Sequence, residues 1–165
     1  MSHTIMMRYT EHASPLGRLL LVATSQGLAG VYFEQHQHFN GPSTDWQRDD
    51  GQPVLRQTIA QLDAYFAGER RSFDLPLDVQ GTPFQRAVWD ALCRIPYGAC
   101  TTYAQHAQSI GNPRAVRAVG TAIGRNPVSI IVPCHRVLGA QKALTGYAGG
   151  LERKKTLLCM EGIPI

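Results

Sequence analysis

The segment Ile130-Ile131-Val132-Pro133-Cys134-His135-Arg136-Val137 places a cysteine next to a histidine at the end of an apolar run. A thiol is a useful nucleophile only as its thiolate, and an imidazole is the commonest protein group that removes the thiol proton. The pair therefore predicts an activated cysteine. On these two residues alone, a buried and inert cysteine beside a surface histidine is the alternative.

The composition is that of an ordinary soluble globular protein: 165 residues, of which 44% are hydrophobic and 17% charged. No apolar stretch is long enough to cross a bilayer, and the N-terminus lacks the basic and apolar segments of a signal peptide. The four cysteines lack the paired spacing of a zinc site, so we expect reduced thiols and a cytoplasmic protein. These cysteines are Cys93, Cys100, Cys134 and Cys159.

The charge is distributed unevenly along the chain. Residues 1–82 contain six Lys/Arg and nine Asp/Glu, whereas residues 83–165 contain ten Lys/Arg and three Asp/Glu. A change of sign of this size favours two units, the second of which binds a polyanion. A solvated basic surface is the alternative.

Residues 1–77 have the pattern of a small α+β domain with an antiparallel sheet and one helix. Apolar runs at 5–9, 19–23 and 28–33 are separated by turn residues and predict two hairpins, followed by a polar loop over 35–52. His36 and His38 lack a third ligand and are therefore too few for a metal site. A helix is expected from Pro53 to just before Gly68, and an edge strand over 73–77, because Pro76 cannot donate to a ladder. Residues 78–82 are the predicted linker.

Residues 83–165 are expected to form a mainly helical domain. Thr82 and Gln85 form a capping box before the first helix, and the last helix spans 151–160 after a loop or hairpin over 139–150. Short helices at 103–109 and 114–124, joined by a tight turn at Gly111, have the layout of a winged-helix-like helix-turn-helix. Core packing explains the small residues of the second helix equally well.

Eight motifs along residues 81–162 together resemble the O6-alkylguanine-DNA alkyltransferases, of the bacterial type. Residues 1–77 resemble the family's N-terminal domain only in size and in the order of elements. The motifs are Thr82-Pro83-Phe84-Gln85, Ile95-Pro96-Tyr97-Gly98, Thr102-Tyr103, Arg117-Ala118-Val119-Gly120, Asn126-Pro127, Ile130 to Val137, Thr145-Gly146-Tyr147-Ala148-Gly149-Gly150 and Glu161-Gly162.

The resemblance implies a DNA repair protein that acts once. Such proteins bind duplex DNA in the minor groove, largely independently of sequence, and rotate the damaged guanine out of the stack. They then move its O6-alkyl group irreversibly to a cysteine, without a metal or an organic cofactor. We expect a monomer; clustering along DNA, the preferred alkyl size and activity on O4-alkylthymine stay open.

The resemblance also assigns roles in the reaction. Cys134 is the nucleophile, His135 is its base through a bound water, and Glu161 orients the imidazole. Glu161 lies at the negative end of the last helix, an unfavourable place for a carboxylate that a bond to His135 would explain; a frayed, solvated end is the alternative. Tyr103 donates a hydrogen bond to the base, and Asn126 ties the turn before Cys134 to the recognition elements.

Further residues are assigned to DNA and to the base pocket. Arg117 fills the gap left by the flipped base, and Arg114 is a weaker candidate for the DNA backbone. Many family members carry Ser where this chain has Ala148, so a side-chain hydrogen bond is missing from the pocket. The other expected DNA contacts are Thr102, Ala118, Gly120, Ile123 and Arg136, and the other pocket residues are Val137, Tyr147 and Gly149.

Three other classes of protein account for less of the sequence. A lesion-recognition module without transfer would lack the acceptor cysteine, which is present here. A Cys-His-Glu thiol hydrolase would have no need of Arg117 or of the basic second half. A transcription regulator would need a specific operator and a dimer interface, for which the sequence offers no element.

Overall fold

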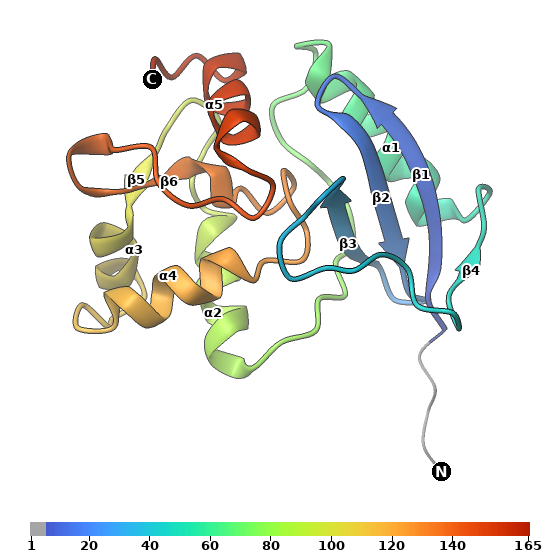
Figure 1. Cartoon of the computed structure of the whole chain (residues 1–165), viewed down its shortest axis with the longest axis horizontal. Helices are drawn as coiled ribbons and strands as arrows, with labels where there is room; N and C mark the ends of the chain where they lie inside the picture. Colours follow the sequence, from blue (N-terminus) through green and yellow to red (C-terminus); the bar gives the residue numbers. More distant parts are fainter. Residues whose placement is uncertain (1–5) are drawn as a thin grey trace. The chain divides into compact units, whose positions relative to one another are not determined.

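The computed structural model describes residues 6–165, and the chain divides into two compact units between Val79 and Gln80 (Figure 1). Within the described residues, no helix combines the length and the apolar character needed to span a bilayer.

The first unit contains a four-stranded mixed sheet. Its order is β3-β2-β1-β4, with β1-β2 and β2-β3 antiparallel, which confirms the two hairpins, and with β4 parallel to β1. The expectation of a purely antiparallel sheet and of a loop throughout 35–52 was therefore wrong. Pairing with β1 makes β4 a strand, because Gln47 donates to the Met7 carbonyl and Asp49 to the Tyr9 carbonyl. The strands are β1 (Arg8–Ser14), β2 (Gly17–Ala23), β3 (Leu28–Phe33) and β4 (Gln47–Arg48).

The first strand differs from its expected position over 5–9. It runs from Arg8 to Ser14, and Ile5 lies outside the described residues. Its polar residues are extended because β1 is an inner strand, paired along its length with the apolar β2. Pairing thus extends the strand beyond its apolar residues.

A single helix, α1 (Pro53–Phe66), packs against β1 and β2 (Figure 1). The Gln52 side chain caps it by accepting the Leu55 N–H, and Pro53 occupies the first turn, where a missing N–H costs nothing. Leu55 and Leu62 are fully buried. The predicted helix is confirmed, and Gly68 follows it with φ of 78°.

The predicted strand over 73–77 is reduced to one bridge. Leu77 pairs with Leu28 in parallel, Leu28 N–H donates to the Pro76 carbonyl, and Asp78 N–H donates to the Leu28 carbonyl. Pro76 has no N–H, so the ladder cannot extend through it. Gly27 allows the close approach, because a Cβ there would lie 2.7 Å from the Pro76 oxygen.

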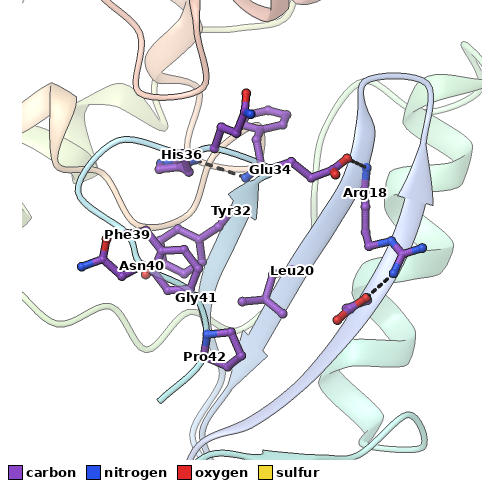
Figure 2. Close-up of a pocket in the computed structure, with 12 residues that line it drawn as sticks. Arg18, Leu20, Tyr32, Glu34, His36, Phe39, Asn40, Gly41 and Pro42 are labelled. Carbon is purple, nitrogen blue, oxygen red and sulfur yellow. Dashed lines mark hydrogen bonds and ion pairs between the residues drawn. The ribbon is translucent and has the colours of Figure 1, made fainter. Parts of the chain in front are cut away.

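Aromatic rings attach the loop after β3 to the sheet. The rings of Tyr32 and Phe39 stack with centroids 3.8 Å apart, and Trp46 lies 6.1 Å beyond Phe39. Figure 2 shows the pocket beside this stack, which Leu20 and Arg18 of β2 help to line. His36 is buried and its Nδ1 accepts the Phe33 N–H, which makes it a structural histidine of this loop.

The second unit is mainly helical, as expected, and α3 and α4 pack together as the helix-turn-helix (Figure 1). Strands β5 and β6 pair in parallel beside them. The start predicted for the helix over 114–124 was wrong: α4 begins at Val116, because Pro113 and Arg114 form a turn that the Ala115 N–H closes by donating to the Asn112 carbonyl. The elements are α2 (Pro83–Leu92), β5 (Thr101–Thr102), α3 (Tyr103–Ser109), α4 (Val116–Gly124), the 3₁₀ helix η1 (Cys134–Arg136), β6 (Val137–Leu138), the 3₁₀ helix η2 (Ala140–Lys142) and α5 (Leu151–Met160).

Two contacts fix the start of α2 and the position of α4. The capping box of Thr82 and Gln85 is present at the start of α2. Trp89, which is buried, donates from Nε1 to the Ala122 carbonyl at 2.8 Å. The indole therefore joins α2 to α4, on which several predicted DNA-contacting residues lie.

We expect Gly27→Ala to lower the free energy of unfolding by about 1–3 kcal/mol, since the new Cβ would overlap the backbone of Pro76. Gly51→Ala is the matched control, because the nearest atom to its Cβ would be 3.7 Å away. Urea denaturation of both variants measures the difference. Equal stability of the two would show that the Leu28–Pro76 contact is not tightly packed.

Candidate active site

The loop between α4 and η1 is organised by one buried side chain. Asn126 donates from Nδ2 to the Val132 carbonyl at 2.9 Å, and its Oδ1 accepts the Val128 N–H at 3.0 Å. Asn126 directly follows Arg125, the C-cap of α4, so the same residue links that helix to the segment that leads to Cys134. A short polar side chain next to Pro127 favours such local bonds.

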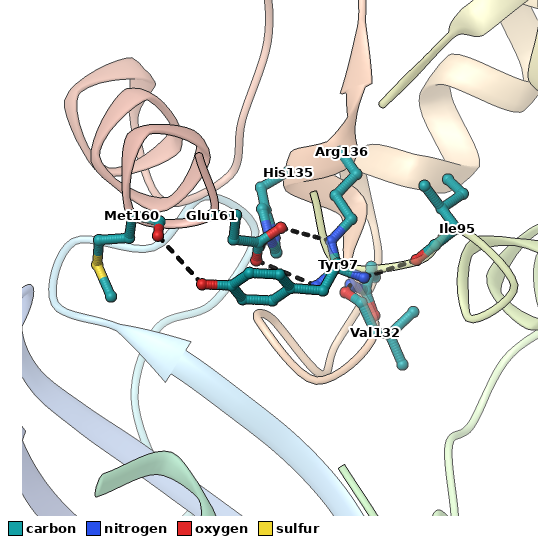
Figure 3. A network of polar contacts seen from close by, with 8 residues as sticks. Ile95, Tyr97, Val132, His135, Arg136, Met160 and Glu161 are labelled. Atoms are coloured by element: carbon teal, nitrogen blue, oxygen red, sulfur yellow. Dashed lines mark hydrogen bonds and ion pairs between the residues drawn. The ribbon is translucent and has the colours of Figure 1, made fainter. Parts of the chain in front are cut away.

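A buried carboxylate joins the end of α5 to η1. Nε2 of His135 lies 2.7 Å from Oε2 of Glu161, and Nε of Arg136 donates to Oε1 of Glu161 at 2.7 Å (Figure 3). Glu161 is only 3% exposed, so the alternative of a frayed, solvated helix end was wrong. The positive charge of Arg136 and the hydrogen bond from His135 offset the unfavourable helix dipole and the cost of burying a charge.

The contact with Glu161 determines which nitrogen of His135 can act as a base. A carboxylate only accepts, so the proton lies on Nε2 and Nδ1 carries the lone pair. Burial lowers the pKa of His135, which keeps the ring neutral. Nδ1 is buried and has no hydrogen-bond partner among residues 6–165.

Arg136 does not fit the predicted role of a DNA contact. It is 6% exposed, and its guanidinium donates to both oxygens of Glu161 and to the Ile95 carbonyl at 2.6 Å. The Tyr97 ring lies 5.9 Å from its Cζ, and the Tyr97 hydroxyl donates to the Met160 carbonyl (Figure 3). The arginine is therefore committed to holding Glu161 in place.

Cys134 is buried at the first position of η1, and it is a free thiol. Burial raises the pKa of this thiol, while hydrogen bonding by Asn126, the positive charge of Lys154 and hydrogen bonding by Tyr147 lower it. Since burial dominates, the resting group is a thiol. Nucleophilic attack then needs a base, which matches the placement of His135.

Lys154 is a site residue that sequence reasoning missed. It is fully buried in α5, and its Nζ donates to the carbonyls of Thr145 and Gly146 at 2.6 and 3.0 Å. Burial lowers its pKa from 10.5 to about 8. The signal was available: position 154 lies three and four residues before the buried Leu157 and Leu158, on the same face of the helix.

Tyr103 lies at the start of α3, where several elements meet. Its hydroxyl donates to the Thr145 carbonyl at 3.3 Å, and Nζ of Lys154 lies 5.8 Å from the centre of its ring. Gly120 of α4 faces the same ring: a Cβ at this position would lie 3.6 Å from Cδ1 of Tyr103. Burial raises the pKa of Tyr103, so the phenol keeps its proton and can donate it in a hydrogen bond.

The predicted pocket residues Tyr147, Ala148 and Gly149 are all buried in the segment before α5. Arg153 donates to the Gly149 carbonyl at 3.1 Å, so α5 holds both ends of this segment. Val137 is fully buried in β6, where it pairs with Thr101. Their contact with a base stays a prediction.

The predicted DNA-contacting residues separate into an exposed and an interior group. Arg114, Arg117 and Ala118 are exposed and line a groove with Phe84 and Gln85 of α2. Ile123 is 5% exposed and belongs to the core, so its assignment to DNA was wrong. Two others have internal roles: the Thr102 hydroxyl caps α3, and Gly120 makes room for Tyr103.

These features define a class of protein: one with a buried cysteine, a His-carboxylate pair beside it and a helix-turn-helix in the same unit. The chain belongs to the O6-methylguanine DNA methyltransferase family. The family's DNA-binding domain matches residues 83–163, and its N-terminal, ribonuclease-like domain matches residues 7–79.

Relatives match the chain over nearly its whole length. A methylated-DNA--protein-cysteine methyltransferase of Haemophilus influenzae is 46% identical over 94% of this chain and 87% of that protein, and one of Methanosarcina acetivorans is 48% identical over 94% and 99%. The crystal structure of the O6-methylguanine methyltransferase of Mycobacterium tuberculosis superposes with a TM-score of 0.85 at 46% identity, covering 94% and 93% of the two chains. A complex of the M. tuberculosis protein with DNA superposes with a TM-score of 0.84 at 44% identity, covering 95% and 92%.

We expect Lys154→Met to change how stability depends on pH. Between pH 8 and 10.5 the unfolded chain binds a proton at Lys154 that the folded chain has released, so this residue makes the free energy of unfolding rise with pH. In the variant, the free energy of unfolding should rise less, or fall more steeply, between pH 8 and 10.5. Urea denaturation at several pH values measures it.

Lys155→Met is the matched control, because Lys155 is the exposed neighbour on the same helix. Its pH dependence should follow that of the unchanged protein. If both variants behave alike, the proton linkage does not come from the buried lysine.

Proposed function

We propose that this protein repairs DNA by direct reversal, moving the alkyl group of O6-alkylguanine, above all O6-methylguanine, irreversibly to Cys134. The observation that carries the proposal is the buried pair of His135 and Glu161 beside a buried thiol. It occurs in a chain of the O6-methylguanine DNA methyltransferase family whose relatives are methylated-DNA--protein-cysteine methyltransferases.

Activation of the thiol uses Nδ1 of His135. This atom takes the Cys134 proton through a bridging water, since a buried polar atom without a protein partner is a site where water binds. The imidazolium that forms is stabilised by Glu161, which faces Nε2. Because burial raises the pKa of the resting thiol, Cys134 reacts only with an electrophile that is held in the pocket.

The transfer itself is a displacement at carbon. The sulfur forms a bond to the alkyl carbon, the bond from that carbon to O6 breaks, and guanine receives a proton in place of the alkyl group. Tyr103 helps the base to leave by donating a hydrogen bond to its ring. In the structure this hydroxyl donates to the Thr145 carbonyl, so it exchanges partners while Lys154 keeps that carbonyl satisfied.

DNA is bound by α4 in the minor groove. Arg117 is exposed on this helix and fills the gap left by the flipped base, and Arg114 contacts the backbone. Small residues such as Ala118 let the helix approach the groove wall. Contacts to the backbone make the binding largely independent of sequence and weaker at high salt.

Several further features follow from the same proposal. The protein acts as a monomer without a metal or an organic cofactor. It acts in the cytoplasm, where Cys134 stays reduced. Ala148 offers no hydroxyl, so the leaving oxygen depends on a backbone N–H of the pocket segment, and the accepted alkyl groups, O4-alkylthymine included, depend on that pocket.

We expect the protein to gain the mass of one methylene per molecule, on Cys134 alone, when it is incubated with duplex DNA containing O6-methylguanine. Cys134→Ala should gain none but still bind the duplex, because the substitution leaves α4 unchanged. Intact-protein mass spectrometry and a digest measure the transfer, and Cys159→Ala, which removes an exposed thiol, is the control. Transfer to another cysteine in Cys134→Ala would contradict the assignment.

We expect Arg117→Ala to slow transfer from duplex DNA by roughly tenfold or more, because flipping a base costs a few kcal/mol. Transfer from free O6-benzylguanine needs no flipping and should change little. Arg125→Ala, which removes another exposed arginine just after α4, is the control for loss of charge alone. An equal loss of rate on both substrates would give Arg117 a different role.

A further inference from the structure

The loop before Cys134 contains a buried residue in an unusual backbone conformation. Five non-glycine residues among 6–165 have a positive φ, and Ile130, with φ of 72°, is the only buried one, at 1% exposure. The other four, Gln35, His38, Gln141 and Lys142, are exposed. Positive φ is a true outlier for a β-branched residue, because its Cβ crowds the backbone.

Ile130 is the central residue of a γ-turn. Ile131 N–H donates to the Ser129 carbonyl at 2.8 Å, which closes a three-residue ring around Ile130. A γ-turn whose central φ is positive is rare and strained, unlike its mirror form. The chain thus holds a strained turn four residues before its nucleophile.

Three hydrogen bonds carry this geometry to Cys134. The turn brings Val132 N–H onto the Val128 carbonyl at 3.0 Å and the Val132 carbonyl onto Nδ2 of Asn126 at 2.9 Å. The same Val132 carbonyl accepts the Cys134 N–H at 2.8 Å, across Pro133. The backbone of Cys134 is therefore anchored to a carbonyl whose own position depends on the turn at Ile130.

We propose that Ile130 is a positioning residue for alkyl transfer: its left-handed turn holds the Val132 carbonyl on Asn126 and so fixes Cys134 for attack. The inference rests on the proposed function and extends it to a residue that touches neither the base nor DNA. Strained backbone is retained where the surrounding structure overdetermines it, and such sites cluster at reacting groups. Here the buried side chain of Ile130 holds the strained backbone in place, because its packing prevents the turn from relaxing.

Two substitutions separate the strain from the packing. Ile130→Gly and Ile130→Ala both remove the buried side chain, but only glycine adopts positive φ freely. The glycine variant should therefore be the more stable of the two, by a factor of roughly 5 to 30 in the folding equilibrium. Val128 is a fully buried residue of the same loop without positive φ, and it serves as the control. There Val128→Ala should be more stable than Val128→Gly, the opposite of the order at Ile130.

The functional readout is the first-order rate constant of methyl transfer at saturating duplex DNA, measured separately from the dissociation constant for that duplex. We expect Ile130→Gly to lower the rate constant by roughly 100-fold, the cost of a displacement of about 1 Å at a reacting atom. Its dissociation constant should not change, because α4 is untouched. Ile130→Val keeps the β-branch and should transfer at nearly the original rate.

Two outcomes would overturn the inference. A glycine variant that transfers at the original rate would show that the turn does not position Cys134, while the unchanged protein still gains its methylene. A glycine variant less stable than the alanine variant, or unable to fold when alanine folds, would show that the turn is not strained. Absence of transfer by the unchanged protein would instead refute the proposed function.

Discussion

The second unit depends on one buried negative charge, the Glu161 carboxylate at the C-terminal end of α5. Removing a carboxylate from water costs several kcal/mol, and that cost is offset only when charged partners and hydrogen bonds satisfy it. Arg136 and His135, the two residues after Cys134, satisfy it in this way. The same bonds that make the burial tolerable therefore fix the end of α5 against η1, and they set the tautomer of His135, the proposed base.

The second constraint is the opposite one, a buried positive charge. Lys154 has no carboxylate partner among the bonds described; its ammonium is held by the carbonyls of Thr145 and Gly146, and burial lowers its pKa. Neutral acceptors compensate a charge less well than an anion does. A thiolate at Cys134 would be the missing anion, so the site is electrostatically better satisfied during the reaction than at rest.

Reactivity in this site is thus conditional. Burial raises the pKa of Cys134 and lowers that of His135, so both groups rest in their neutral forms. The neutral pair is inert toward bystander molecules, and the proton transfer that activates it creates two opposite charges beside Glu161 and Lys154. A protein that is consumed by one reaction benefits from a nucleophile that stays protected until its substrate fills the pocket.

The sequence by itself determined the local structure and the chemistry. Capping residues, Pro53 and Pro83, and the spacing of apolar residues predicted α1, α2, α3 and α5, because these signals act within one turn of helix. The motifs around Cys134, His135 and Glu161 identified the residues to which we assign the reaction. Only the tertiary structure decided the rest: β4 exists because β1 pairs with it, Arg136 and Ile123 are interior residues rather than DNA contacts, and Lys154 is buried. Strand pairing, burial and the balance of a buried charge depend on groups far apart in the chain, and so no local pattern could specify them.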